Sequence, residues 1–87
     1  MLSDGGFKMV ERIKDKKVVG IKQSTKVLKT EKCKTLYIAK DANLALLREV
    51  ENLAKDNSVE IVYIDTMREL GKLCGIDVKA SVAVTLE

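Results

Sequence analysis

The residues whose types and spacing best suit chemistry lie between positions 20 and 34. Lys22, Lys26 and Lys29 are separated by four and then three residues, so a helix would place them on one face. Like charges at this spacing repel by about 0.2–0.5 kcal/mol per pair, so such a stripe indicates an anionic partner. The alternative is a basic helix face that meets only water.

Two neighbouring residues give this face a means of recognising nucleic acid. Gly20 precedes the predicted helix and lets a ligand approach the backbone closely. The N–H groups of a first helical turn attract phosphate. Gln23 can both donate and accept hydrogen bonds, which reading a base edge requires and charge attraction does not. For Gln23 the alternative is an ordinary exposed helix residue.

The distribution of charge also favours a nucleic-acid partner. Residues 8–34 contain ten Lys or Arg and three acids, which gives a net charge of +7. The rest of the chain contains six Lys or Arg and ten acids, a net charge of −4, and the two parts sum to +3. This uneven distribution indicates a nucleic-acid partner more strongly than the total charge of the chain does.

Length and composition predict one folded domain over residues 1–87. Hydrophobic residues make up 46% of the chain, enough for a core. No apolar run approaches the roughly 18 residues that span a bilayer, and the N-terminus lacks an apolar signal segment. We therefore expect a cytoplasmic protein with no membrane contact.

The chain shows no catalytic or metal-binding pattern. It has no histidine, no Walker-type glycine loop and no Gly-x-Gly-x-x-Gly motif, and its two cysteines lie 41 residues apart. We expect Cys74 to be a buried thiol and Cys33 a surface or edge cysteine, whose pKa the adjacent lysines would lower if it is exposed. Asp41 and Asp65 follow predicted strands, and helix capping is their expected role. The sequence thus predicts a protein that is not an enzyme and needs no cofactor.

Hydrophobic periodicity predicts an αβαβαβαβ order and an α/β fold. The expected helices cover about 7–16, 20–32, 44–55 and 66–74, and the expected strands 17–20, 35–39, 59–64 and 81–86. Asp41 or Asn43 is a candidate cap for the third helix, Thr66 and Glu69 form a capping box, and Gly75 suits a left-handed helix end. Crossover helices between short apolar strands predict a small mixed four-stranded sheet within a three-layer α-β-α sandwich.

Three stretches resemble the kink-turn-binding ribosomal proteins of the L7Ae and L30e type. They are Gly20–Lys26, the strand and turn at Leu36–Ala42, and the late segment Leu70–Val84, and the resemblance covers about residues 7–86. The archaeal and eukaryotic pattern is Gly-x-Asn-Glu-x-x-Lys, whereas this chain has Lys22 and Gln23 at the Asn-Glu positions. The Lys-Gln form resembles the bacterial branch of the family.

The resemblance implies a mechanism of RNA recognition. The start of the 20–32 helix would enter the widened groove of a sharply bent internal loop, where sheared G–A pairs expose guanine edges. Lys22 would then meet guanine acceptors, Gln23 a base edge, and Lys26 a guanine or a nearby phosphate. The segment Ile76–Ala80 would lie over splayed-out loop nucleotides. The alternative for its Ile76 and Val78 is that they close the core.

The resemblance therefore implies a monomeric, ribosome-associated protein that binds structured RNA with a kink-turn or kink-loop and forms a ribonucleoprotein. The residues expected to bind RNA are Gly20, Ile21, Lys22, Gln23, Lys26, Lys34, Lys40, Ile76, Asp77, Val78, Lys79 and Ala80. The competing hypothesis is an interaction or structural subunit whose basic face docks on an acidic protein.

Overall fold

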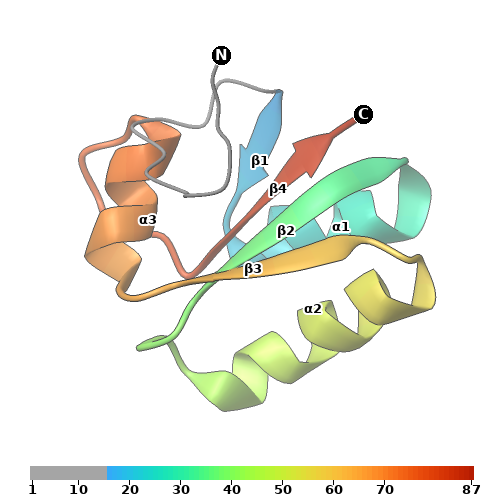
Figure 1. The fold of residues 1–87 in the computed structure, drawn as a ribbon, viewed down its shortest axis with the longest axis horizontal. Coiled ribbons are helices and arrows are strands. Elements are labelled where there is room, and N and C mark those ends of the chain that lie inside the picture. The colour runs from blue at the N-terminus through green and yellow to red at the C-terminus, as the bar shows by residue number, and fades with distance from the viewer. Residues whose placement is uncertain (1–15) are drawn as a thin grey trace.

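The computed structural model describes residues 16–87, which form four strands and three helices (Figure 1). In chain order these are β1 (Lys17–Val19), α1 (Ile21–Thr30), β2 (Cys33–Ala39), α2 (Leu44–Asp56), β3 (Glu60–Ile64), α3 (Met67–Cys74) and β4 (Val82–Leu86). The helix predicted over 7–16 lies outside the described residues except for Lys16. The predicted order of the remaining elements is confirmed.

The four strands form one mixed sheet in the order β1-β4-β2-β3. Strand β4 runs antiparallel to both β1 and β2, whereas β2 and β3 are parallel and are joined by the crossover helix α2. The last strand of the chain is therefore central in the sheet. This position brings the residues before β4 next to the turns after β1 and β2.

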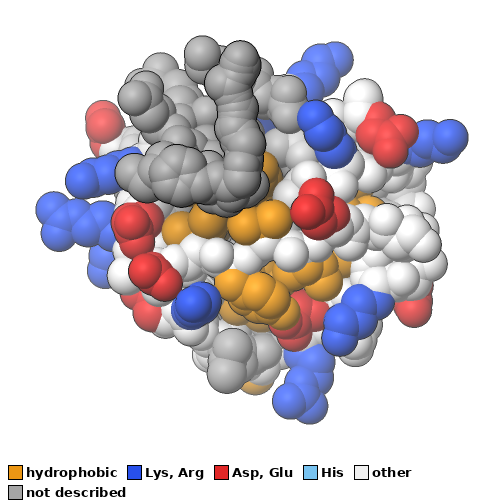
Figure 2. Space-filling view, viewed as in Figure 1, with side chains coloured by type: hydrophobic (Ala, Val, Ile, Leu, Met, Phe, Trp, Pro, Cys, Tyr) orange, Lys and Arg blue, Asp and Glu red, His pale blue; other side chains and the backbone are white. Residues whose placement is uncertain are grey.

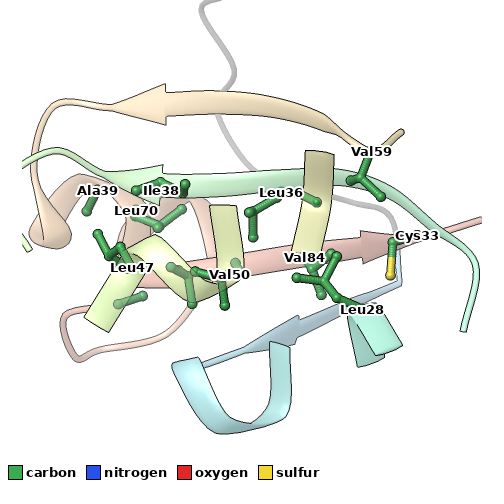
Figure 3. Packing of buried hydrophobic residues seen from close by; sticks show 14 of the residues in the cluster. Leu28, Cys33, Leu36, Ile38, Ala39, Leu47, Val50, Val59, Leu70 and Val84 are labelled. Carbon is green, nitrogen blue, oxygen red and sulfur yellow. The ribbon is translucent and has the colours of Figure 1, made fainter. Parts of the chain in front are cut away.

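Helices cover both faces of the sheet, as the three-layer prediction requires. Leu36 and Val84 are register partners and so share one face, where Leu28 of α1 and Leu47 and Val50 of α2 pack (Figure 3). Helix α3 lies on the opposite face and contributes the fully buried Leu70 (Figure 1). Burying side chains of this size stabilises the fold by about 1.5–3 kcal/mol each.

The lysine-striped helix is shorter than expected. It ends at Thr30, because Glu31 adopts an extended conformation with φ −133° and ψ 162°, and β2 begins at Cys33 rather than at residue 35. Cys33 is buried, and its thiol donates to the Val27 carbonyl of α1 at 3.6 Å. The next residue, Lys34, falls within a register shift between Cys33 and Thr35.

Side chains cap two of the helices as the sequence predicts. The side chain of Asn43 accepts a hydrogen bond from the Ala45 N–H at 2.9 Å, and Thr66 Oγ1 accepts one from the Glu69 N–H at 3.0 Å. Gly75 ends α3 in the left-handed region with φ 77°.

The predicted capping role is wrong for Asp65, and Asp41 caps a different helix from the one that follows it in sequence. Thr66 occupies the cap position of α3, and Asp65 instead lies 3.4 Å from the ammonium of Lys40. Asp41 Oδ1 accepts a hydrogen bond from the Met67 N–H at 2.8 Å, so it serves α3 and not the helix that follows it in sequence. No helix between residues 16 and 87 is long and apolar enough to cross a membrane.

Candidate nucleic-acid interface

The start of α1 is open to solvent. Gly20 has φ 106° and ψ 152°, a region that is essentially restricted to glycine. A Cβ atom built on Gly20 would meet no atom of the described chain within 4 Å, so the backbone, rather than a lack of space, requires the glycine. The first turn of α1 receives no side-chain cap within residues 16–87. Its N–H groups therefore remain suitable for an anionic ligand.

The predicted division of α1 into two faces is confirmed. Val27 and Leu28 are buried in the core, whereas the side chains of the polar face are exposed. These exposed residues are Lys22, Gln23, Lys26 and Lys29. Since Ile21–Thr30 contains no Asp or Glu, nothing within the helix neutralises its lysines.

The segment 76–80 is held tightly against α3. The Ile76 N–H donates to the Gly71 carbonyl at 3.1 Å, and the Ala80 N–H donates to the Met67 carbonyl at 3.1 Å. A Cβ atom on Gly71 would lie 2.1 Å from the Val78 carbonyl oxygen, so only glycine permits this approach. The path of the segment is therefore fixed by backbone contacts with α3.

This path displays some of the predicted contact residues and buries others. The side chain of Val78 is 67% exposed, an uncommon state for a large apolar residue in a tightly held segment, and Asp77 and Lys79 are also exposed. Ile76 is half-buried and packs against the core, and Ala80 is buried within it. Of the two apolar residues predicted to contact RNA or close the core, Val78 faces outward, whereas Ile76 is partly exposed and packs against the core.

The sheet brings the start of α1 and this segment together. The Gly20 N–H donates to the Val82 carbonyl at 3.0 Å, two residues after the segment ends, and the Ala39 N–H donates to the Ser81 carbonyl at 2.9 Å. Gly20, Lys40 and the end of the segment 76–80 therefore lie at one end of the sheet although they are far apart in sequence. We call this end, with Lys22, Gln23 and Lys26 of α1, the recognition end.

Lys40 is positioned at the recognition end by β3. Its N–H donates to the Ile64 carbonyl at 2.8 Å, and its ammonium pairs with Asp65 at 3.4 Å. Both side chains of the pair are mostly exposed, so the interaction stabilises the fold by about 0–1 kcal/mol. A phosphate could therefore replace the Asp65 carboxylate at little cost.

Lys34 does not join the recognition end. It lies near the beginning of β2, where the register partner of Cys33 is Leu86, at the opposite end of β4 from Val82. Five residues of β2 lie between Lys34 and Lys40, so the two are about 20 Å apart. Of the predicted RNA-binding residues, Lys34 thus lies at the opposite end of the sheet from Gly20 and Lys40.

Cys33 is not the surface cysteine that the sequence predicted, because its side chain is buried. Burial raises the pKa of its thiol, and the carboxylates of Glu31 and Glu87 raise it further. Cys74 is buried as predicted, and burial raises the pKa of its thiol despite the opposing charge of Lys17. Both thiols are free. Within residues 16–87, no group of three or more His, Cys, Asp or Glu could hold a metal ion.

Residues 8–87 match the model of the ribosomal protein L7Ae/L30e/S12e/Gadd45 family. The chain belongs to this family. One relative is a protein of Caldanaerobacter subterraneus subsp. tengcongensis, named as an RNA-binding protein, which is 44% identical over 75 residues, 86% of this chain and 92% of the relative. Another, from Bacillus pumilus and also named as an RNA-binding protein, is 44% identical over 70 residues, 79% of this chain and 85% of the relative.

A solved structure of the 15.5kD RNA binding protein of Giardia lamblia shares the fold. It superposes with a TM-score of 0.77 at 23% sequence identity, and the match covers 83% of this chain and 61% of that one. The L7Ae/L30e/S12e/Gadd45 fold thus accounts for the mixed sheet and its three helices.

The structural environments of two residues, Gly71 and Ser24, were not predicted from the sequence. Gly71 lies inside an amphipathic helix, where glycine destabilises the helix by about 0.8–1 kcal/mol relative to alanine. A glycine at such a position is the one feature of the sequence that indicates a close backbone contact there. Ser24 is fully buried on α1, and its hydroxyl has no hydrogen-bond partner among the described residues. Nothing in the spacing of Ser24 distinguishes it from an exposed helix serine.

Proposed function

We propose that this protein binds RNA and recognises a kink-turn or kink-loop. The observation that carries the proposal is the 3.0 Å hydrogen bond from the Gly20 N–H to the Val82 carbonyl. It holds the uncapped start of α1 beside the segment 76–80, so that one RNA element could contact both. Membership of the family and the names of its relatives in bacteria support an RNA partner.

The start of α1 would read the bent part of the RNA. A regular A-form helix hides its major groove, so sequence readout is concentrated at loops, bulges and other irregular sites. Lys22 would donate to guanine acceptors, Gln23 would pair with a base edge, and Lys26 would contact a guanine or a phosphate. The open space above Gly20 permits the RNA backbone to approach the first turn.

The segment 76–80 would form the second wall of the site. Val78 offers an exposed apolar surface to an unstacked base, and Lys79 offers a positive charge to the adjacent phosphate. Lys40 completes the recognition end from β2. In this proposal the protein performs no chemistry, acts as a monomer in the cytoplasm and associates with the ribosome.

The test of specificity is a comparison of two RNA duplexes. One contains a kink-turn, and the other has its G–A pairs replaced by Watson–Crick pairs. We expect the first to bind at least tenfold more tightly, because each well-placed base contact contributes about 1–3 kcal/mol of discrimination. Equal affinities would rule out specific recognition.

Two matched variants locate the source of the discrimination. Gln23→Ala should reduce the ratio of the two affinities, whereas Asn52→Ala, which removes an exposed amide from α2, should leave the ratio unchanged. If both variants retain the wild-type ratio, Gln23 does not read the RNA.

Association with the ribosome requires a separate experiment. Sedimentation of cell extracts before and after nuclease treatment distinguishes an RNA-mediated from a protein-mediated complex. Release of the protein by nuclease supports the proposal. Retention after complete digestion of the RNA would favour an acidic protein partner instead.

A further inference from the structure

The end of the sheet opposite the recognition end also carries lysines. We call Lys16, Lys29, Lys32 and Lys34 the distal lysines, and all four side chains are exposed. The Leu86 N–H donates to the Lys16 carbonyl at 2.9 Å, and the Glu87 N–H donates to the Lys32 carbonyl at 3.2 Å. These two bonds place Lys16 and Lys32 on either side of the end of β4, with their backbones about 10 Å apart.

The other two distal lysines are brought to the same place by α1 and by the irregularity of β2. Lys29 lies in the last turn of α1, just before the chain turns back into the sheet. Lys34 lies at the register shift between Cys33 and Thr35, opposite the last residues of β4. Figure 2 shows Lys or Arg side chains at the upper right, around the chain end labelled C in Figure 1.

Carboxylates also lie at this end of the sheet, although α1 itself carries none. Glu31 and Glu87 lie beside Cys33 and therefore close to this end of β4. Glu60 is the register partner of Thr35 and so lies one position from Lys34 on the neighbouring strand, and Asp56 ends α2 at the same end of the sheet. On α3, by contrast, acidic and basic side chains alternate, as the left of Figure 2 shows. The positive surface therefore follows α1 from Lys22 to Lys29 and continues to Lys32.

The distance between the two ends decides how the distal lysines could act. Along the strands, Lys34 lies about 20 Å from Lys40 and Lys16 about 13 Å from Gly20, whereas Lys29 lies only about 5 Å beyond Lys26 along α1. The Debye length at physiological salt is about 8 Å, so charges about 13–20 Å away hardly affect a phosphate bound at the start of α1. Distal lysines at that distance can contribute to RNA binding only if they meet phosphates of their own.

We propose that the distal lysines are a second contact surface for the phosphate backbone of the same RNA, in the duplex stem that continues beyond the kink along α1. The proposal rests on the proposed function, because the kink fixes where the stem begins. Phosphate contacts position a nucleic acid without reading its sequence. The distal lysines would therefore add affinity and salt dependence but no discrimination between the two test duplexes.

The experiment combines two protein variants with two lengths of stem. The distal variant is Lys16→Gln/Lys32→Gln, and the control variant is Lys55→Gln/Lys72→Gln, which removes the same charge from exposed positions on α2 and α3. Lys29 is left unchanged because it adjoins Lys26 of the recognition end on α1, and Lys34 because it takes part in another interaction. Each variant is titrated with a kink-turn RNA whose stems are about 16 base pairs long, a length that double-stranded RNA-binding domains span. A second RNA retains only the pairs next to the kink.

We expect the distal variant to bind the long-stem RNA about tenfold more weakly than the control variant does. Its log–log salt slope should be shallower by about 1.5, since two contacts contribute roughly 0.7–0.9 each. On the short-stem RNA the two variants should bind alike. Equal binding of both variants to the long-stem RNA would overturn the inference, and so would an equal loss on both stem lengths.

The wild-type protein separates this inference from the proposed function. If it distinguishes the kink-turn from the Watson–Crick duplex while the distal variant equals the control, only the second surface is wrong. If the wild-type protein makes no distinction with either stem length, the proposed function is wrong. Thermal unfolding of both variants checks that the exposed substitutions leave the fold intact.

Discussion

The beginnings of α1 and α3 differ in almost every respect that matters for a ligand. Helix α1 starts after Gly20 without a side-chain cap among the described residues and without an acid in its first turn. Helix α3 starts after Thr66, which accepts a hydrogen bond from the Glu69 N–H, while the Asp41 carboxylate accepts one from the Met67 N–H. The first helix leaves its N–H groups for a partner, and the second satisfies them within the protein.

The two glycines repeat the same difference. No atom of residues 16–87 lies where a Cβ of Gly20 would be, whereas the Val78 carbonyl fills the corresponding space at Gly71. Gly20 thus gives access to α1, and Gly71 gives the segment 76–80 its position on α3. The start of α1 leaves backbone groups for a ligand, whereas α3 fixes the position of the segment 76–80.

The largest expected effect is that of Gly71→Ala. In an open helix this change would stabilise the protein by up to about 1 kcal/mol. Here the new methyl group would meet a backbone carbonyl, so we expect the free energy of unfolding to fall by about 3 kcal/mol, the upper part of the usual range for overpacking. Denaturant unfolding measures the change. The neighbouring substitution Lys72→Ala, at an exposed position, is the control and should be nearly neutral. An increase in stability for Gly71→Ala would show that the segment is not held against α3.

The next largest effect concerns binding rather than stability. Lys26→Ala should weaken kink-turn binding about tenfold, and because one phosphate contact contributes roughly 0.7–0.9, it should flatten the log–log salt slope by that amount. Lys55→Ala, an equivalent loss of an exposed lysine from α2, should change neither quantity. Titrations over a range of salt concentrations measure both. Identical results for the two variants would mean that Lys26 and its face of α1 do not contact the RNA.

Thr66→Ala tests the other side of the comparison. Loss of this cap should lower the free energy of unfolding by about 1 kcal/mol. Since α3 satisfies its own N–H groups, RNA affinity at temperatures well below unfolding should stay at the wild-type value. Thermal unfolding and RNA titration on the same sample check the two statements. A strong loss of affinity would mean that the start of α3 takes part in recognition.

The contrast between the two helices was only partly visible in the sequence. The capping box at Thr66 and the lysine stripe of α1 are local patterns of three or four residues, and the structure confirms both. The role of Asp41 was mistaken because its partner, Met67, lies 26 residues away and becomes a neighbour only when β2 and β3 pair. Burial of Cys33 likewise depends on α1 packing back against the start of β2.

The same limit applies to the candidate site. Spacing along α1 predicts which lysines share a face, but it says nothing about where Lys34 lies relative to Lys40. That separation follows from the central position of β4, which sends the two ends of β2 to opposite ends of the sheet. The close contact between Gly71 and Val78 is also invisible locally, because it joins a helix to the segment that folds back over it.

The smallest expected effect tests whether Lys40 belongs to the recognition end. Its partner Asp65 holds the ammonium at 3.4 Å and competes with any phosphate for it. Asp65→Asn should therefore raise RNA affinity about threefold, a change of about 0.6 kcal/mol, within the 0–1 kcal/mol expected for an exposed ion pair. Asp56→Asn removes the same charge at the end of α2, at the other end of the sheet, and serves as the control. An equal gain in both variants would indicate a general effect of net charge. A gain in Asp65→Asn alone, abolished when Lys40→Ala is added, would assign Lys40 to the same surface as the open start of α1.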